Sequence, residues 1–227
     1  MPNLNTILGI AEQVTITDQR FVGQSISRNQ RISTSEIVTN VPFQFEFKPM
    51  NYLLYSQNRD LLANLRYYDK SLEQYLNFGT TGWQNYIAYR GEMTSVQIGA
   101  CQWQTSSTNK TLVLGNLPSI TSTKYIVKAG DFCQVGRYAY IATQDVLRGS
   151  GTTVSIPVHR NLITPLVSPL NAVIGQYGTT VSMGEQTYTG ITFAVILQQY
   201  PNYTLMPITN DSYIQWNQSF KAFEAIV

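Results

Sequence analysis

The residues that could carry out catalysis are few in this sequence. Histidine occurs once, at His159, and the 227-residue chain has 13 acidic residues. A Ser-His-Asp triad would have to be built on His159, yet the sequence holds no Gly-x-Ser-x-Gly nucleophile elbow. A hydrolase could still use His159 or a pair of carboxylates brought together from distant positions. We predict instead that His159 is a structural or a surface histidine and that the protein is not an enzyme.

Metal and cofactor sites are not indicated either. A zinc site needs about four His, Cys or carboxylate ligands, and His159 with the distant Cys101 and Cys133 is too thin a set. No phosphate-binding glycine loop, dinucleotide fingerprint or calcium loop occurs. We therefore expect no catalytic, cofactor-binding or metal-binding residues. The apolar surroundings of Cys101 and Cys133 favour buried free thiols, although a disulfide between them stays open, because it depends on how closely their Cα atoms approach.

Aromatic residues are the other group that could bind a ligand. Tyr67, Tyr68, Trp83, Tyr86 and Tyr89 lie close together in the sequence, and aromatic faces stack on sugars or bases in carbohydrate and single-strand binders. Aromatics are also enriched in sheets and at protein interfaces. We favour packing as their role.

The composition favours contacts between proteins. Charged residues make up 12% of the chain, against a usual share of about 25%, and neutral polar residues with 15 tyrosines take their place. Burying such a surface desolvates few ions. The net charge of +2 gives no basic stripe for nucleic acid, and no apolar run reaches the roughly 18 residues of a membrane span, so we expect no membrane insertion.

One amphipathic helix is predicted among strands. Apolar residues recur at steps of three and four over residues about 51–78, which is the spacing of one helix face. Just before it, Phe43, Phe45 and Phe47 alternate with polar residues, which indicates a strand whose apolar face the helix covers. The residues at helical spacing are Leu61, Leu65, Tyr68, Leu72, Tyr75 and Leu76.

The rest of the chain is predicted to form strands. Residues 1–12 give an arm or an edge strand, and from residue 94 short strands bounded by turn residues indicate a small barrel or sandwich. Residues 213–227 alternate well enough to return as a strand to the first sheet. The other predicted strands span 13–18, 21–26, 32–41, 84–90, 96–102, 111–114, 125–127, 132–135, 138–142, 154–158 and 192–198.

A resemblance emerges in the stretch Lys128-Ala-Gly-Asp-Phe-Cys-Gln-Val-Gly-Arg-Tyr-Ala-Tyr-Ile-Ala-Thr-Gln-Asp-Val-Leu-Arg-Gly-Ser-Gly, followed by Val154-Ser-Ile-Pro-Val-His-Arg-Asn-Leu. It resembles a module of tailed-bacteriophage structural proteins. The order of elements over residues about 14–165 is similar to that of distal tail and baseplate-hub ring proteins, whose first domain shares the tail-tube fold. The long stretch 164–189 departs from that pattern.

This resemblance implies a mainly β fold in two units. Residues 1–93 plus 170–227 would form a tail-tube-like β-sandwich or barrel packed on one α-helix. Residues 94–169 would form an inserted small β-barrel.

The resemblance also implies a function. The protein would be a structural virion protein, assembled in the host cytoplasm, that forms a ring, commonly six-fold, at the distal tail or baseplate hub. The ring would continue the tail tube and dock tube, hub, wedge or fibre proteins. Residues 14–41 and 43–48 would line its bore, where contact with DNA is transient and independent of base sequence. The alternatives are a carbohydrate- or receptor-binding tail-fibre module, a tube cap or terminator, and a baseplate wedge protein.

Overall fold

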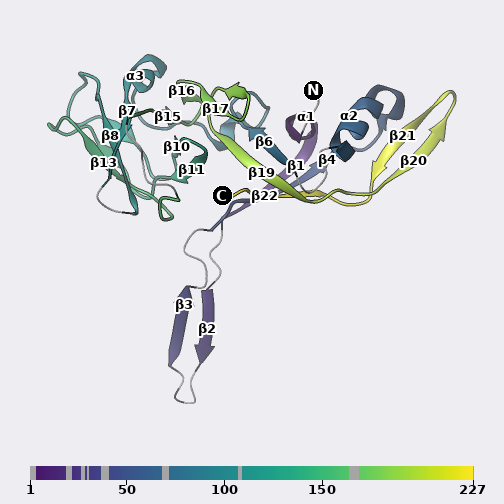
Figure 1. Ribbon diagram of the computed structural model, residues 1–227, viewed down its shortest axis with the longest axis horizontal. Helices are drawn as coiled ribbons and strands as arrows, with labels where there is room; N and C mark the ends of the chain where they lie inside the picture. The colour runs from purple at the N-terminus through teal and green to yellow at the C-terminus, as the bar shows by residue number, and fades with distance from the viewer. Residues whose placement is uncertain are drawn as a thin grey trace.

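The computed structural model describes residues 4–18, 22–26, 29, 31–36, 41–67, 72–106, 109–163 and 169–226. Strands account for 45% and helices for 14% of the structure, so the prediction of a mainly β protein is confirmed. The strands form several antiparallel sheets, and Figure 1 shows how they are arranged.

The central sheet joins the two ends of the sequence. Its strand order is β1-β4-β22-β19-β6, so two strands from the last part of the chain, β22 and β19, lie between β4 and β6 from the first part. The predicted return of residues 213–227 to this sheet is correct only in part. Strand β22 pairs with β4, and Phe220 lies opposite Phe47. Residues 213–216 instead belong to β21 (Asp211–Trp216), a strand of a different sheet. The five strands are β1 (Ala11–Thr17), β4 (Gln44–Pro49), β6 (Glu73–Asn77), β19 (Thr192–Gln199) and β22 (Phe220–Glu224).

The row of phenylalanines before and within β4 forms the centre of a large apolar core. Phe43, Phe45 and Phe47 are inaccessible to solvent, as predicted. Phe193 of β19 packs edge-on against Phe43 and Phe45, with ring centroids 5.1 and 4.9 Å apart, the arrangement that aromatic quadrupoles favour. The short helix α1 (Leu4–Gly9), predicted as an arm or edge strand, packs mainly on β6 and β4 and buries Leu4 in this core.

The predicted helix over residues 51–78 is correct only in part. Helix α2 spans Tyr55–Tyr67 and packs mainly against β21, with its leucines in the same core as the phenylalanines. Residues 73–77 form β6 instead, where Leu76 pairs with Phe193 of β19; residues 68–71, with Tyr68, lie outside the described residues. The helical spacing of apolar residues continues into Tyr75 and Leu76, but pairing with β19 outweighs it and these residues form a strand.

Two further predicted strands are helical. Residues 84–86 of the predicted strand 84–90 form a 3-10 turn (Gln84–Tyr86), and most of the predicted strand 96–102 is helix α3 (Ser95–Ala100). A capping box starts α3: the Thr94 hydroxyl accepts a hydrogen bond from the backbone N–H of Gln97, and the Gln97 side chain accepts one from the backbone N–H of Thr94. The expectation of a single helix is therefore wrong. No helix in the described residues is long and apolar enough to cross a bilayer.

Two four-stranded sheets form the part of the molecule that contains α3. Their strand orders are β13-β8-β7-β14 and β11-β10-β15-β16. Strands β14 to β16 follow residue 169, yet β14 pairs with β7, β15 pairs with β10, and β16 pairs with β15. The division of the chain into two units stays a prediction. The strands of this part, with the small pair β9–β12, are β7 (Gln102–Gln104), β8 (Thr111–Gly115), β9 (Tyr125–Val127), β10 (Phe132–Val135), β11 (Tyr138–Ile141), β12 (Val146–Leu147), β13 (Val154–Pro157), β14 (Leu170–Asn171), β15 (Val173–Ile174) and β16 (Tyr177–Gly178).

The sheet β11-β10-β15-β16 lies between two apolar cores. Phe132 and Val173 belong to the phenylalanine core, whereas their neighbours Cys133 and Ile174 belong to a second core around Trp103. Successive side chains of a strand point to opposite faces, so one layer serves both cores.

Hairpins extend away from this body (Figure 1). Strands β2 (Val22–Ile26) and β3 (Ile32–Glu36) pair with each other, in agreement with the predicted strands 21–26 and 32–41 as far as these are described. At the end opposite α3, β20 (Tyr203–Ile208) pairs with β21 (Asp211–Trp216), which also pairs with β5 (Leu53–Leu54). A smaller hairpin is formed by β17 (Val181–Met183) and β18 (Gln186–Tyr188).

Candidate functional site

His159, the candidate for catalysis, is integrated into the junction between β11 and β13. Its imidazole Nδ1 accepts a hydrogen bond from the backbone N–H of Ile141 at 3.0 Å, and the backbone N–H of His159 donates to the Ile141 carbonyl at 3.0 Å. The imidazole ring lies 5.4 Å from the ring of Phe43. Within the described ranges, no group of three His, Cys, Asp or Glu side chains is placed to hold a metal ion.

The two cysteines are buried free thiols rather than a disulfide. Burial raises the pKa of the Cys101 thiol to about 11 and raises the pKa of Cys133 even further above its ordinary value. The thiolate is the reactive form of cysteine. Both residues therefore stay protonated and unreactive at neutral pH.

Trp83 and Tyr89 donate hydrogen bonds to backbone carbonyls inside the fold. The Trp83 indole N–H donates to the Leu8 carbonyl at 3.0 Å, and the Tyr89 hydroxyl donates to the Ile126 carbonyl. The Tyr86 ring packs 5.0 Å from that of Phe132, and burial raises the pKa of Tyr86 and of Tyr89. These contacts favour the packing role over a ligand platform. Tyr68 and the side chain of Tyr67 lie outside the described part of the chain.

The Lys128-Ala-Gly-Asp motif is a turn held by its own aspartate. The Asp131 carboxylate accepts hydrogen bonds from the backbone N–H groups of Lys128 at 2.8 Å and Arg90 at 2.9 Å. Burial raises its pKa, and these hydrogen bonds oppose that effect. Gly130 has φ +90°, and a Cβ atom there would meet the Arg90 guanidinium. The motif therefore has a structural function in this chain.

A buried ion pair between Arg160 and Glu224 links the two parts of the molecule, and sequence reasoning missed it. Both side chains are 1% exposed, and the guanidinium donates to both carboxylate oxygens, with Nη2 2.7 Å from Oε1. The same guanidinium donates to the carbonyls of Val41 at 2.8 Å and Ala139 at 2.7 Å. Arg160 follows β13 and Glu224 ends β22, so the pair joins the part of the molecule that contains α3 to the central sheet.

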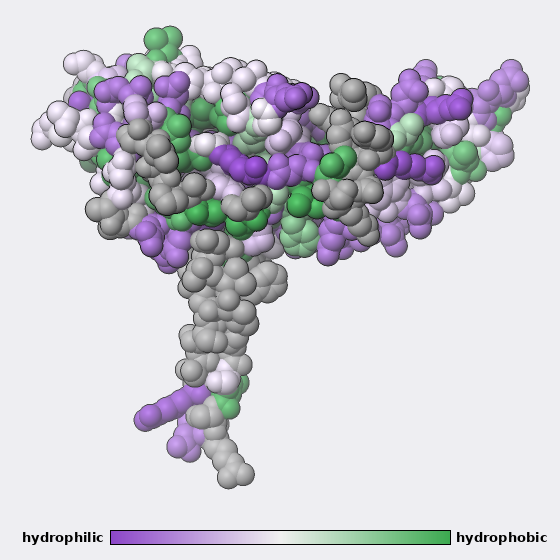
Figure 2. Space-filling model, viewed as in Figure 1, coloured by the Kyte–Doolittle hydropathy of each residue, from purple (hydrophilic) through white to green (hydrophobic). Residues whose placement is uncertain are grey.

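The hairpin β20–β21 presents apolar side chains to solvent. Its outer face, opposite the one that α2 covers, carries Tyr52, Met206, Ile208 and Tyr213, because directly paired residues of adjacent strands share a face. Met206 is 41% and Ile208 40% exposed, and none of the four residues is charged. Figure 2 shows further apolar patches between hydrophilic residues on the visible face.

The edge of the same hairpin is free within the described residues, because β20 is the outermost strand of its sheet. Beside it lies a hollow of about 350 Å³. In this hollow Arg66 of α2 donates to the Tyr203 hydroxyl at 3.2 Å and lies over the Tyr203 ring. Tyrosine, arginine and methionine are the residues enriched at protein interfaces.

No protein-family model matches the chain, and a search of curated proteins finds no significant match. The functional conclusion therefore depends on the geometry above and on the resemblance carried by residues 128–162.

Proposed function

We propose that the protein is a structural subunit of a bacteriophage tail or baseplate, that copies of it assemble into a ring, commonly six-fold, and that it catalyses no reaction. The observation that carries this proposal is the pair of projecting hairpins with exposed apolar residues. Ile26 of β2 is 71% exposed, and Met206 and Ile208 of β20 are exposed at the far end of the body.

These hairpins suit the interface of a closed ring. In a ring each subunit uses two different patches, and the rotation between neighbours closes the assembly. A free strand edge such as that of β20 is an aggregation hazard unless a neighbour pairs with it. The outer face of the β20–β21 hairpin carries one carboxylate, Asp211 opposite Ile208, beside the neutral residues Tyr52, Met206, Ile208 and Tyr213. Contact there therefore desolvates few ions.

In this proposal the central sheet is the tail-tube-like unit and residues 94–169 are the inserted barrel. The ring continues the tail tube at the distal tail or baseplate hub of the virion and contacts tube, hub, wedge or fibre proteins. Strands β1 to β4 line the bore. Lys48 pairs with Glu12 at 2.9 Å and Glu46 with Lys221 at 3.8 Å, so these lysines are not free to bind phosphate. DNA would then pass without tight phosphate binding.

The test is the mass and shape of the purified chain, measured by light scattering and negative-stain microscopy. We expect annular particles from the wild type. The double variant Met206→Glu/Ile208→Glu should give monomers, because it buries two carboxylates in the subunit contact. The matched control is Val96→Glu on α3, where the native valine is 81% exposed, and it should still form rings. A wild type that stays monomeric at high concentration and after cross-linking would overturn the proposal.

A further inference from the structure

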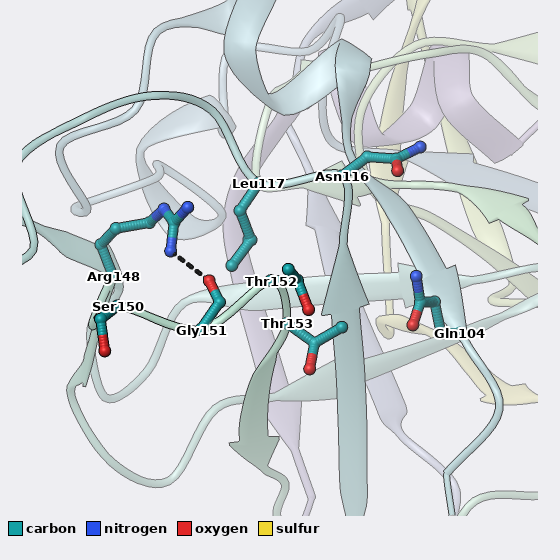
Figure 3. A pocket seen from close by; sticks show the side chains of 8 residues that line it. All are labelled: Gln104, Asn116, Leu117, Arg148, Ser150, Gly151, Thr152 and Thr153. Carbon is teal, nitrogen blue, oxygen red and sulfur yellow. Dashed lines mark hydrogen bonds between the residues drawn. The ribbon is translucent and has the colours of Figure 1, made fainter.

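A polar hollow of about 460 Å³ lies in the part of the molecule that contains α3 (Figure 3). The turn after β8 forms one side with Asn116 and Leu117, and the loop between β12 and β13 forms the other with Arg148 and Thr152. Gln104 at the end of β7 contributes an amide. None of the described residues that line the hollow is a carboxylate.

Arg148 brings an unneutralised positive charge to this hollow. Its Nε donates to the Pro118 carbonyl at 3.0 Å, and its Nη1 donates to the carbonyls of Gly151 at 2.6 Å and Gly149 at 3.3 Å. These acceptors are neutral, and no acidic side chain of the described residues forms an ion pair with Arg148. The contacts fix the plane of the guanidinium, while Nη2 makes no hydrogen bond within the described part of the chain. A fixed guanidinium edge is a good donor to an oxyanion.

The opposite wall is held by Gly115 and Gln102. A Cβ atom at position 115 would overlap the side-chain amide of Gln104, so the glycine is what allows that amide to lie across β8. Asn116 donates from Nδ2 to Oε1 of Gln102 at 2.9 Å. The neutral side-chain amides of Gln104 and Asn116 are therefore held in place on this wall.

We propose that this hollow binds a sugar that carries an oxyanion, either a carboxylate or a phosphate. The oxyanion pairs with Arg148, and the sugar hydroxyls exchange hydrogen bonds with Gln104, Asn116 and Thr152. Leu117 is the one apolar side chain in the lining, so a peptide finds little apolar contact. One guanidinium also cannot supply the several cations that tight binding to a nucleic-acid backbone requires. This inference goes beyond the ring and does not depend on it.

The test is titration of the full chain with galacturonate, glucose 6-phosphate, glucose and inorganic phosphate, followed by calorimetry and NMR. We expect saturable binding of at least one charged sugar, at least about tenfold tighter than glucose or inorganic phosphate. If galacturonate binds more tightly, the oxyanion is a carboxylate; if glucose 6-phosphate binds more tightly, it is a phosphate. Absence of saturable binding, equal binding of glucose, or equal binding of inorganic phosphate would each overturn the proposal. Tighter binding of N-acetylglycine, a stand-in for a peptide carboxylate, would also overturn it.

Two variants separate the site from the fold. Arg148→Gln should weaken binding of the charged sugar at least about tenfold, whereas Arg59→Gln, at an exposed position on α2, should leave it unchanged. Gly115→Ala should also weaken binding, because it displaces the Gln104 amide while the hydrogen bonds of Arg148 remain. Unchanged binding in both Arg148→Gln and Gly115→Ala would contradict the proposal.

Discussion

The regions around Arg160 and Arg148 use the same side chain in opposite ways. Arg160 is buried, pairs with the carboxylate of Glu224 and lies over the rings of Phe43 and Tyr140 at 5.0 and 5.2 Å. Arg148 is half-buried and contacts neutral carbonyls. A buried charge must be neutralised in place because its desolvation is costly. The partly solvated charge of Arg148 needs no such partner, so it remains available to a ligand.

The Arg160 region also determines how several distant segments meet. The Glu224 carboxylate accepts a hydrogen bond from the backbone N–H of Phe43 at 3.1 Å, and the Glu224 N–H donates to the Phe43 carbonyl at 2.8 Å. Through the guanidinium, the same cluster includes the carbonyl of Ala139 in β11. Removal of one member therefore leaves several buried polar groups without partners.

The largest effect is expected from breaking this buried pair. Glu224→Ala should lower the free energy of unfolding by about 3–5 kcal/mol, because the Arg160 charge stays buried without a counter-ion. Denaturation in urea measures the change. The double variant Arg160→Met/Glu224→Met should cost less than the single one, since no charge remains. A loss below about 1 kcal/mol in Glu224→Ala would show that the pair is far less buried in solution.

A smaller effect is expected from Arg148→Gln. This change removes hydrogen bonds to carbonyls at a partly solvated site and leaves no buried opposite charge without a partner. The free energy of unfolding should therefore fall by about 1 kcal/mol. The same urea titration measures it. If the loss equalled that of Glu224→Ala, the contrast between the two arginines would be wrong.

The smallest effect is expected at Asp211, a half-buried charge at the start of β21 that contacts the first turn of α2. Its carboxylate accepts hydrogen bonds from the Ser56 hydroxyl at 2.6 Å and the Ser56 N–H at 3.2 Å, and the hydroxyl contact is the main cause of its lowered pKa. A pKa that is lower in the folded state stabilises the fold at neutral pH, and this contribution is lost as the pH falls through the folded-state value. Thermal unfolding should show a slightly lower Tm for Asp211→Asn at pH 7, and the difference should shrink in acid. A constant difference at all pH values would exclude this linkage.

Local patterns in the sequence predicted part of this fold. The strand predicted from the alternation of Phe43, Phe45 and Phe47 was correct, because a half-buried strand leaves a period of two in its own residues. The predicted return of 213–227 to the first sheet was correct only for residues 220–224, since 213–216 belong to β21. The predicted helix ran too far because chance spacing at Tyr75 and Leu76 continued that of α2. The prediction of a strand over 96–102 was wrong because it did not take into account the Thr94–Gln97 capping box, a helix signal that is present in the sequence.

The candidate sites could not be predicted in the same way. Arg160 and Glu224 are 64 positions apart, and no local period relates them. Glu224 does lie among apolar residues, which is a sequence signal of burial. Arg160 is flanked by His159 and Asn161 and carries no such signal. The hollow around Arg148 is built from the end of β7, the turn after β8 and the loop before β13, and only the folded chain brings these segments together.

The sheet β11-β10-β15-β16 has a consequence for how the molecule folds and unfolds. Since alternate side chains of this layer complete one core and then the other, neither half of the protein has a finished interior without it. Loss of this layer exposes both cores to water, so we expect the unfolding of one core to be coupled to that of the other.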